Sequence, residues 1–172
     1  MVVNDDAHQR INIREARESD LKPINRLYRQ INVQHYQGAP EVFAQLPDEQ
    51  HQEMGELHRQ ICDAECHFAV AEFGGNIIGY VTARIKEAPK VSFLRDHLIC
   101  RVDTIVVSES AQGLGVGSSL MANVKAWALY QGATELRLEV MEFNQGAIEF
   151  YHAQGMETQS RIMSMSLDDS DI

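Results

Sequence analysis

The fold is decided by Asp103-Thr-Ile-Val-Val107, which is followed four residues later by Gln112-Gly-Leu-Gly-Val-Gly117. The first segment is an apolar, β-branched run that predicts a buried strand, and the second predicts a glycine loop that opens a helix. This order leaves backbone N–H groups free at a helix N-terminus, with no bulky side chain above them. Because proteins bind pyrophosphate in this way, we predict a pyrophosphate site at residues 112–118.

Two common nucleotide-binding loops do not fit this segment. A Walker loop ends in Gly-Lys-Ser/Thr, whereas this loop ends in Gly117-Ser118-Ser119 and has no lysine. A dinucleotide fingerprint has the spacing G-x-G-x-x-G, whereas Gly113, Gly115 and Gly117 are two residues apart. The sequence therefore argues against both nucleoside triphosphate hydrolysis and dinucleotide-dependent redox chemistry.

The downstream sequence adds a second pattern. Leu136-Arg-Leu-Glu-Val-Met-Glu-Phe-Asn144 is followed by Ala147-Ile-Glu-Phe-Tyr151 and then by Gly155. Together with Gln112-x-x-Gly115-x-Gly117, this order resembles the GNAT superfamily of acetyl-CoA-dependent N-acetyltransferases. The resemblance extends in order, spacing and residue type from Asp103 to Gly155.

The expected fold is α/β (α+β), with a mixed, mostly antiparallel central sheet of six to seven strands and helices on both faces. We expect a single N-acetyltransferase domain over residues 1–172, with an ordered core at 10–167. Apolar periodicity predicts strands at 10–16, 67–73, 77–84, 97–107, 134–141 and 159–167, and helices over 21–31, 54–61, 115–131 and 144–155.

Composition limits the partners. The 172-residue chain has a formal net charge of −10 and 44% hydrophobic residues, which suits a globular protein and disfavours nucleic acid or an anionic membrane. It contains no apolar run of membrane-spanning length and no secretory-type start. Its three cysteines suit a reducing cytoplasm. The acidity favours a cationic substrate such as an amine.

The resemblance implies acetyl-CoA as co-substrate. The backbone of the loop would bind the pyrophosphate, and the strand before it would pair with the pantetheine arm. Asn144 would lie near the coenzyme, although helix capping alone explains an asparagine there. No basic residue lies between Val107 and Ser119, so the loop must bind mainly through amide groups. The implied coenzyme-binding residues are Ile105, Val106, Val107, Gln112, Gly113, Leu114, Gly115, Val116, Gly117, Ser118 and Asn144.

The resemblance also implies catalytic residues. Tyr151 matches the family's tyrosine acid, which protonates the leaving thiolate, although a half-buried core tyrosine would look the same in sequence. Asp103 and Glu139 are alternative general bases for the amine, and Glu142 would bind a second ammonium group. Each carboxylate could instead be a solvated charge at a strand end.

A possible metal cluster is rejected on geometry. His58, Cys62 and Cys66 are four residues apart, with His67 adjacent, and these residue types bind zinc. Three ligands over two helical turns would span ~12 Å, too far for one tetrahedral ion. We therefore expect no metal.

Two functions of different classes follow. The first is an N-acetyltransferase that moves an acetyl group to a primary amine, either a small or polyamine-like amine or a peptide α-amine or lysine. The alternative is a non-catalytic acyl-CoA-binding module. Dimers are frequent in the family, so the resemblance also implies a homodimer.

Overall fold

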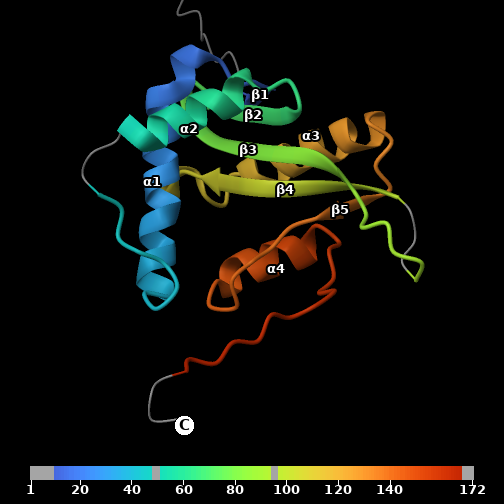
Figure 1. Cartoon of the computed structure of the whole chain (residues 1–172). Helices are drawn as coiled ribbons and strands as arrows, with labels where there is room; N and C mark the ends of the chain where they lie inside the picture. Colours follow the sequence, from blue (N-terminus) through green and yellow to red (C-terminus); the bar gives the residue numbers. More distant parts are fainter. Residues whose placement is uncertain (1–9, 48–50, 94–96, 168–172) are drawn as a thin grey trace, which may run out of the picture. The chain divides into compact units, whose positions relative to one another are not determined.

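The structure is a computed structural model that describes residues 10–47, 51–93 and 97–167. The chain falls into two compact units, one up to Glu139 and one from Val140 onward. The first unit contains a five-stranded sheet and the helices that pack on it, and the second contains α4 (Gln145–Ala153). Figure 1 shows the elements of both units.

The sheet follows chain order, β1-β2-β3-β4-β5. The first three pairings are antiparallel and β4 pairs with β5 in parallel, so the sheet is mixed and mostly antiparallel, as predicted. The turn between β2 and β3 has positive φ at Gly74 (56°) and Gly75 (78°), which glycine allows without steric cost. The strands are β1 (Asn12–Glu15), β2 (Cys66–Phe73), β3 (Asn76–Glu87), β4 (Leu98–Val107) and β5 (Glu135–Arg137).

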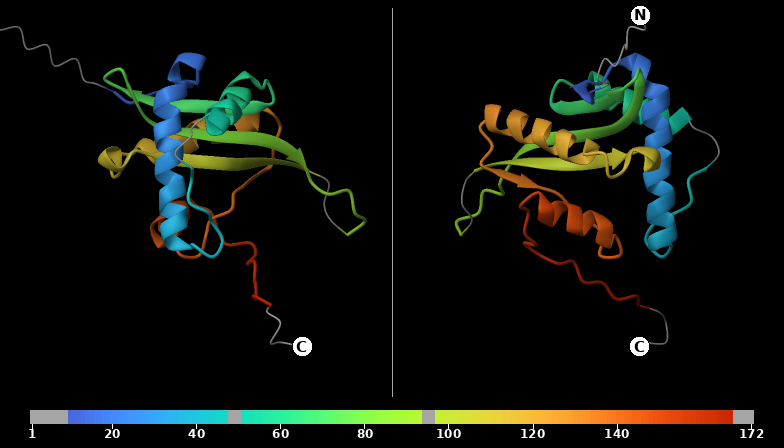
Figure 2. Two further views of the ribbon diagram at one scale, coloured as in Figure 1. Left: turned by 60° about the vertical axis from the view of Figure 1, so that its left-hand side comes forward. Right: turned by 180° about the vertical axis from the view of Figure 1, so that it is seen from behind.

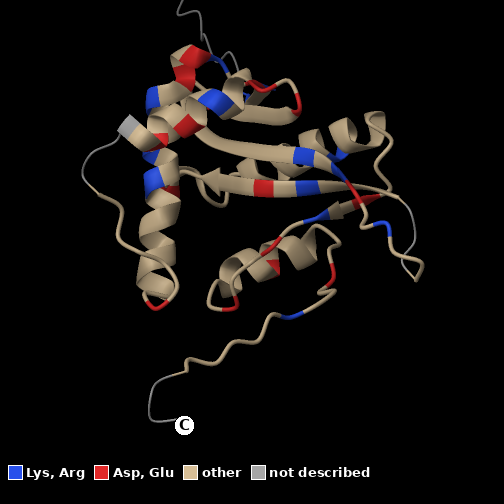
Figure 3. Ribbon diagram, in the orientation of Figure 1, with Lys and Arg blue, Asp and Glu red and all other residues tan. Residues whose placement is uncertain are grey.

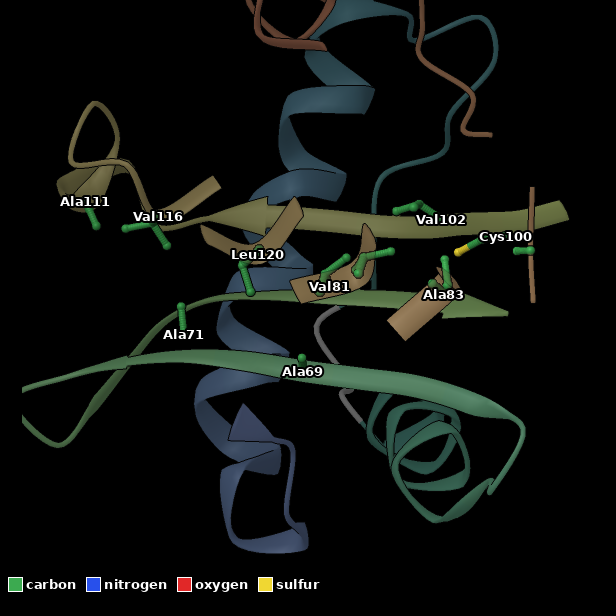
Figure 4. Close-up of a cluster of buried hydrophobic side chains, with 12 residues drawn as sticks. Ala69, Ala71, Val81, Ala83, Cys100, Val102, Ala111, Val116 and Leu120 are labelled. Carbon is green, nitrogen blue, oxygen red and sulfur yellow. The ribbon is translucent and has the colours of Figure 1, made fainter. Parts of the chain in front are cut away.

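Helices cover both faces of this sheet (Figure 2). One face packs on α1 (Leu21–Gly38) and α2 (His51–Cys62) through Phe68, Tyr80 and Val106. The other packs on α3 (Val116–Tyr130), whose buried Val116 and Leu120 lie over small strand residues (Figure 4), and Val124 belongs to the same buried cluster. The two short 3-10 segments are η1 (Glu18–Asp20) and η2 (Glu109–Ala111).

Small side chains let α3 approach the sheet closely. Ala69, Ala71 and Ala83 line the face beneath it. Gly79 is tighter still, because a Cβ built there would lie 2.9 Å from the carbonyl oxygen of Val106 and 3.2 Å from Cγ1 of Val116. The start of α3, which carries the glycine loop, is thus fixed by direct packing on β3.

A β-bulge interrupts β4 at Asp103. Thr82 is opposite Thr104 and Ala83 is opposite Val102, which leaves Asp103 as the inserted residue with no partner in β3. Cys100 and Val102 face α3 before the bulge, and Ile105 and Val107 pack against the same cluster after it. The bulge therefore changes which positions of β4 face each helix layer.

The prediction of six to seven strands is wrong, because the described residues form five. The strand expected at 134–141 is limited to Glu135–Arg137, since it pairs with β4 only over Ile99–Arg101. The segment 159–167 forms no strand and is exposed throughout. Its alternating apolar residues suggested a strand, but Ile162 alone among 160–167 is β-branched or aromatic, so strand propensity is weak.

Candidate active site

The glycine loop ends where α3 begins. Gly113 (φ 78°) and Gly115 (φ 81°) are both left-handed, and Gly115 is the N-cap of the helix. The first backbone N–H groups of any α-helix have no partner within the helix, and here they belong to the loop and to Val116 and Gly117. This local geometry confirms the predicted sequence of strand, glycine loop and helix.

The surface of the loop is open. A Cβ built on either Gly113 or Gly115 would have no heavy atom within 4 Å, and the intervening Leu114 is 65% exposed. By contrast, Val116 is buried against the sheet and anchors the first turn of α3. An anion could therefore approach the amides of a rigidly held helix end, where the helix dipole also favours negative charge.

The strand that leads to this loop has an open edge. β4 pairs with β5 only through Ile99, Cys100 and Arg101. Beyond Arg101, no ladder with another described strand occupies that side, whereas on the other side pairing with β3 continues to Val107. Pairing between the two strands thus ends ahead of the glycine loop, as the addition of an extended segment to this edge would require.

The ladder pattern identifies the backbone groups on this edge. The Ser108 N–H donates to the Ile78 oxygen at 2.8 Å, so the neighbouring Gly79–Val107 pair is of the non-hydrogen-bonded type. The N–H and C=O groups of Val107, and by the two-residue period those of Ile105, therefore point away from β3 and toward the open edge. Those of Val106 point toward β3.

Gln30 on α1 holds the end of this strand, a role that the sequence analysis missed. Its Nε2 donates to the Val107 oxygen at 3.0 Å, and its Oε1 accepts from the Glu109 N–H at 3.3 Å. A polar residue next to the apolar stripe of α1 was the available signal, but the partner is 77 residues away in sequence.

Asp103 lies between two arginines. Its carboxylate is 3.9 Å from Nε of Arg84 on β3 and 3.7 Å from Nε of Arg101 on β4. Arg84 also contacts Asp63 at 2.6 Å. Basic and acidic positions thus lie side by side on β3 and β4 (Figure 3). Contacts with two arginines thus explain a charged residue at position 103 without any catalytic role, and the sequence analysis did not find these contacts.

Glu139 forms an ion pair with Arg101, one of the two arginines beside Asp103. Its Oε2 accepts from Nη2 of Arg101 at 3.2 Å, and its side chain is 58% exposed. The structure therefore brings the two candidate bases, Asp103 and Glu139, to one guanidinium. Both carboxylates are accessible to solvent.

The second unit contains the other predicted residues. Asn144 caps α4, its Oδ1 accepting from the Ala147 N–H at 3.2 Å, so the capping role is confirmed. Tyr151 lies on α4, with its ring in edge contact with Phe150. Burial raises the pKa of Tyr151 to about 12. The phenol therefore keeps its proton throughout the neutral range.

Glu142 is exposed and precedes the cap. Its carboxylate lies 4.0 Å from Nη2 of Arg161, an exposed pair of little energetic weight. Its backbone oxygen accepts from Nε2 of Gln145 at 2.6 Å. The charge of Glu142 thus interacts weakly with that of Arg161, because solvent screens this exposed pair.

The mixed sheet with helices on both faces and the glycine loop at the start of α3 define a mixed α/β fold. A model of the acetyltransferase (GNAT) family matches residues 25–156, and the chain belongs to this family. Within the described residues, no helix combines the length and apolarity needed to cross a bilayer.

Individual relatives agree with this assignment. An N-alpha-acetyltransferase of Sulfurisphaera tokodaii is 33% identical over 101 residues, which cover 54% of this chain and 58% of that protein. The chain spans about half the length of the curated relatives it matches.

Solved structures agree on the fold. A mutant BH1408 protein from Bacillus halodurans superposes with a TM-score of 0.84 at 21% identity, covering 91% of this chain and 99% of the other. The aminoglycoside N-acetyltransferase AAC(6')-Iy in complex with CoA gives a TM-score of 0.72 at 18% identity, covering 94% and 97%.

Proposed function

We propose that the chain moves an acetyl group from acetyl-CoA to a primary amine by direct attack in a ternary complex, and that its two units form one catalytic domain. The observation that supports this most is the open edge of β4 running directly into the glycine loop. The edge and the loop suit the two parts of coenzyme A, an extended amide-containing arm and a pyrophosphate.

The loop binds the pyrophosphate through its backbone in this proposal. The space above Gly113 and Gly115 is open, so a ligand can approach the loop backbone there, where the dipole of α3 also favours an anion. The N–H groups of Gln112 and Leu114 already donate to the oxygens of Glu109 and Ala111 at 3.4 Å, so the other amides of 112–118 are the main donors in this proposal. Glu109 lies close by, and no basic residue occupies 107–119, so electrostatic attraction is weaker than in loops with arginine. Asn144, already the cap of α4, is assigned to the coenzyme by its match to the family pattern.

The arm pairs with Ile105 and Val107, whose backbone groups point to the open edge. The carbonyl oxygen of Val107 is already bonded to Gln30, which leaves its N–H and both groups of Ile105 for the ligand. By resemblance to the family, one of these N–H groups is also proposed to donate to the thioester oxygen as negative charge develops there. A donor of this kind is commonly worth ~3 kcal/mol. Val106 contributes its buried side chain beneath the arm.

The reaction has a simple balance. The amine nitrogen attacks the thioester carbon, the C–N bond forms and the C–S bond breaks. The thiolate takes a proton from Tyr151, and the proton lost by the amine passes to a carboxylate, directly or through water. A thiol has a pKa of ~8.5, below the pKa of about 12 of the buried phenol, so this proton transfer is uphill on its own. The phenol therefore acts first as a hydrogen-bond donor to the sulfur as the C–S bond breaks, and solvent restores any proton that it gives up.

We assign the base to Asp103 first and to Glu139 second. The bulge displays Asp103 on β4 two residues before Ile105, where the arm would end. The ion pairs with Arg84 and Arg101 keep this carboxylate in one region without burying it. A cationic amine must compete with these two arginines for the Asp103 carboxylate.

The acceptor class is a small or polyamine-like amine, with a peptide α-amine or lysine as the second choice. The aminoglycoside acetyltransferase supports the first class and the archaeal N-alpha-acetyltransferase the second. Exposed Glu142 is proposed to bind a second ammonium group, for which Arg161 would have to move aside.

The test is acetyl-CoA turnover against a panel of amines, with free thiol and acetylated product both measured. We expect turnover with at least one amine class and a loss of about 10²-fold or more in kcat for Tyr151→Phe. The alternative, a non-catalytic acyl-CoA module, predicts coenzyme binding without thiol release from any amine. No binding of coenzyme to the folded chain would exclude both functions.

A further inference from the structure

Three zinc-type ligands converge on the first unit, away from the glycine loop. They are Glu18 of η1 and His58 and Cys62 of α2, and one ligand atom from each lies within 4.8 Å of the other two. We propose that these residues form a surface binding site for a divalent transition metal, Zn²⁺ foremost. The sequence analysis rejected a different trio, His58, Cys62 and Cys66, because of its length along a helix. It did not consider Glu18, which is 40 positions from His58 in sequence.

Two of the three ligand separations fit a tetrahedral ion closely, and the third, between Glu18 and Cys62, is at most 4.8 Å. Nε2 of His58 lies 3.8 Å from Sγ of Cys62 and 3.4 Å from Oε2 of Glu18. Ordinary zinc bond lengths at tetrahedral angles place a nitrogen about 3.6 Å from a sulfur and about 3.4 Å from an oxygen. The ligands therefore need to move by only tenths of an ångström at these two contacts, and water would supply the fourth ligand.

The segments that carry the ligands are held in place independently of a metal. Arg14 donates to both oxygens of buried Asp20 at 2.7 and 3.0 Å, which fixes η1 against β1. Arg29 of α1 donates to both oxygens of Glu53 at 2.9 Å, which fixes α2. The Arg14–Asp20 pair is bidentate, whereas one nitrogen of Arg29 donates to both oxygens of Glu53. Neither pair involves a side chain of the proposed site, so the convergence of Glu18 on α2 does not depend on those side chains.

The local charge also favours a cation. Cys62 is the last residue of α2, where the helix dipole contributes partial negative charge. His58 and Cys62 are one helical turn apart, so a single ion can bridge them without distorting the helix. Ligand binding by Cys62 requires loss of its thiol proton to solvent, which leaves one thiolate and one carboxylate around the ion.

The other two thiols are poor competitors. Burial raises the pKa of the Cys100 thiol to about 11, and it raises the pKa of the Cys66 thiol as well. Cys66 starts β2 and takes no part in the cluster. His67 stacks on Trp127 and is within hydrogen-bond distance of Asn123, 2.8 Å away. Cys66→Ala is therefore a matched thiol control.

The experiment is calorimetric titration of the chelator-treated full chain with Zn²⁺. We expect one ion per chain, and a dissociation constant at least about tenfold higher in Cys62→Ser, His58→Gln and Glu18→Gln. Cys66→Ala and Glu56→Gln, the latter an exposed carboxylate on the same helix, should bind like the native chain. Each variant is checked for folding by its thermal transition, which Zn²⁺ should raise only where the site is intact.

Co²⁺ gives an independent measurement. Its thiolate-to-metal absorption band should appear in the native chain and in Cys66→Ala, and should be absent from Cys62→Ser. The proposal is overturned if folded native chain binds no metal in excess Zn²⁺, or if Cys62→Ser binds as tightly as the native chain. Both readouts are independent of acetyl transfer, so they do not depend on the proposed function.

Discussion

Arg101 and Glu139 form an ion pair, with Nη2 of the arginine 3.2 Å from Oε2 of the glutamate. The same guanidinium lies 3.7 Å from Asp103 through its Nε. One cation thus serves both candidate bases, and a change in either carboxylate alters the surroundings of the other. Their positions do not distinguish the general base, so the roles of Asp103 and Glu139 must be assigned from the kinetics of variants.

Replacing Asp103 by Asn should lower kcat by about 10²-fold or more with the preferred amine, because the amine proton loses its acceptor. Glu139→Gln should have a smaller effect. Asp63→Asn is the matched control, since Asp63 pairs with Arg84 as Asp103 does but is not a candidate base. Steady-state kinetics at saturating acetyl-CoA provides the measurement. Native-like kcat in Asp103→Asn would remove Asp103 from the mechanism.

The pH profile of kcat should show no decrease at alkaline pH that is caused by ionisation of Tyr151. The proton donor is the neutral phenol of Tyr151, which is present below its folded-state pKa of about 12. Ionisation of Tyr151 therefore should not reduce kcat below about pH 10. A kcat profile from pH 6 to 10 checks this. A decrease between pH 8 and 10 that Tyr151→Phe abolishes would contradict it.

Gly115→Ala should weaken coenzyme binding. An alanine at φ 81° carries about 1–2 kcal/mol of backbone strain, and relieving that strain would turn the loop amides away from the pyrophosphate. We expect the dissociation constant for coenzyme A to rise about tenfold by calorimetry. Gly75→Ala carries similar strain at φ 78° in the β2–β3 turn, and it should leave coenzyme affinity unchanged. Equal effects in both variants would indicate general destabilisation instead.

Gln30→Ala should raise the KM for acetyl-CoA severalfold while changing kcat less. The substitution removes the two hydrogen bonds that hold the backbone at Val107 and Glu109. Asn32→Ala on the same helix is the control, because the side-chain amide of Asn32 donates to the Tyr28 oxygen within α1 and not to β4 in the described residues. A KM that is unchanged by Gln30→Ala would show that the strand end holds its position without this clamp.

Gly79→Ala should destabilise the fold by about 1–3 kcal/mol, because the new methyl group meets backbone at 2.9 Å. Gly55→Ala provides the opposite control. A Cβ on Gly55 meets nothing within 4 Å on α2, so helix propensity should stabilise the chain by about 0.5–1 kcal/mol. Urea unfolding of both variants makes the comparison, and a neutral Gly79→Ala would contradict the close packing of α3.

The sequence predicted those parts of the site that depend on local geometry. The glycine loop follows from steric rules at Gly113 and Gly115, and the cap of α4 follows from the side chain of Asn144. The family pattern between Asp103 and Gly155 also gave the correct family. These features depend on neighbours within a few residues, which a single sequence displays directly.

Long-range features escaped prediction because register and packing decide them. The Asp103 bulge depends on how β4 pairs with Ala83 and Thr82, so the two arginines beside the carboxylate were not foreseen. Gln30 and Glu18 act on partners far away in sequence. At 159–167 the sequence analysis expected a strand that the structure does not contain. Alternating apolar residues indicate a strand only where a neighbouring strand is present to pair with them.

Because Asp103 is an extra residue in β4, the number of residues in this strand determines which face the side chains after it point to. Even-numbered positions before Asp103 face α3, and odd-numbered positions after it do so. Deleting one residue there would reverse the faces of Ile105, Val106 and Val107. Val106 would then point toward α3, and Ile105 and Val107 would point toward α1 and α2. A substitution of Asp103 changes a side chain and keeps the strand register, whereas its deletion would change which residues of β4 pack in each layer of the core.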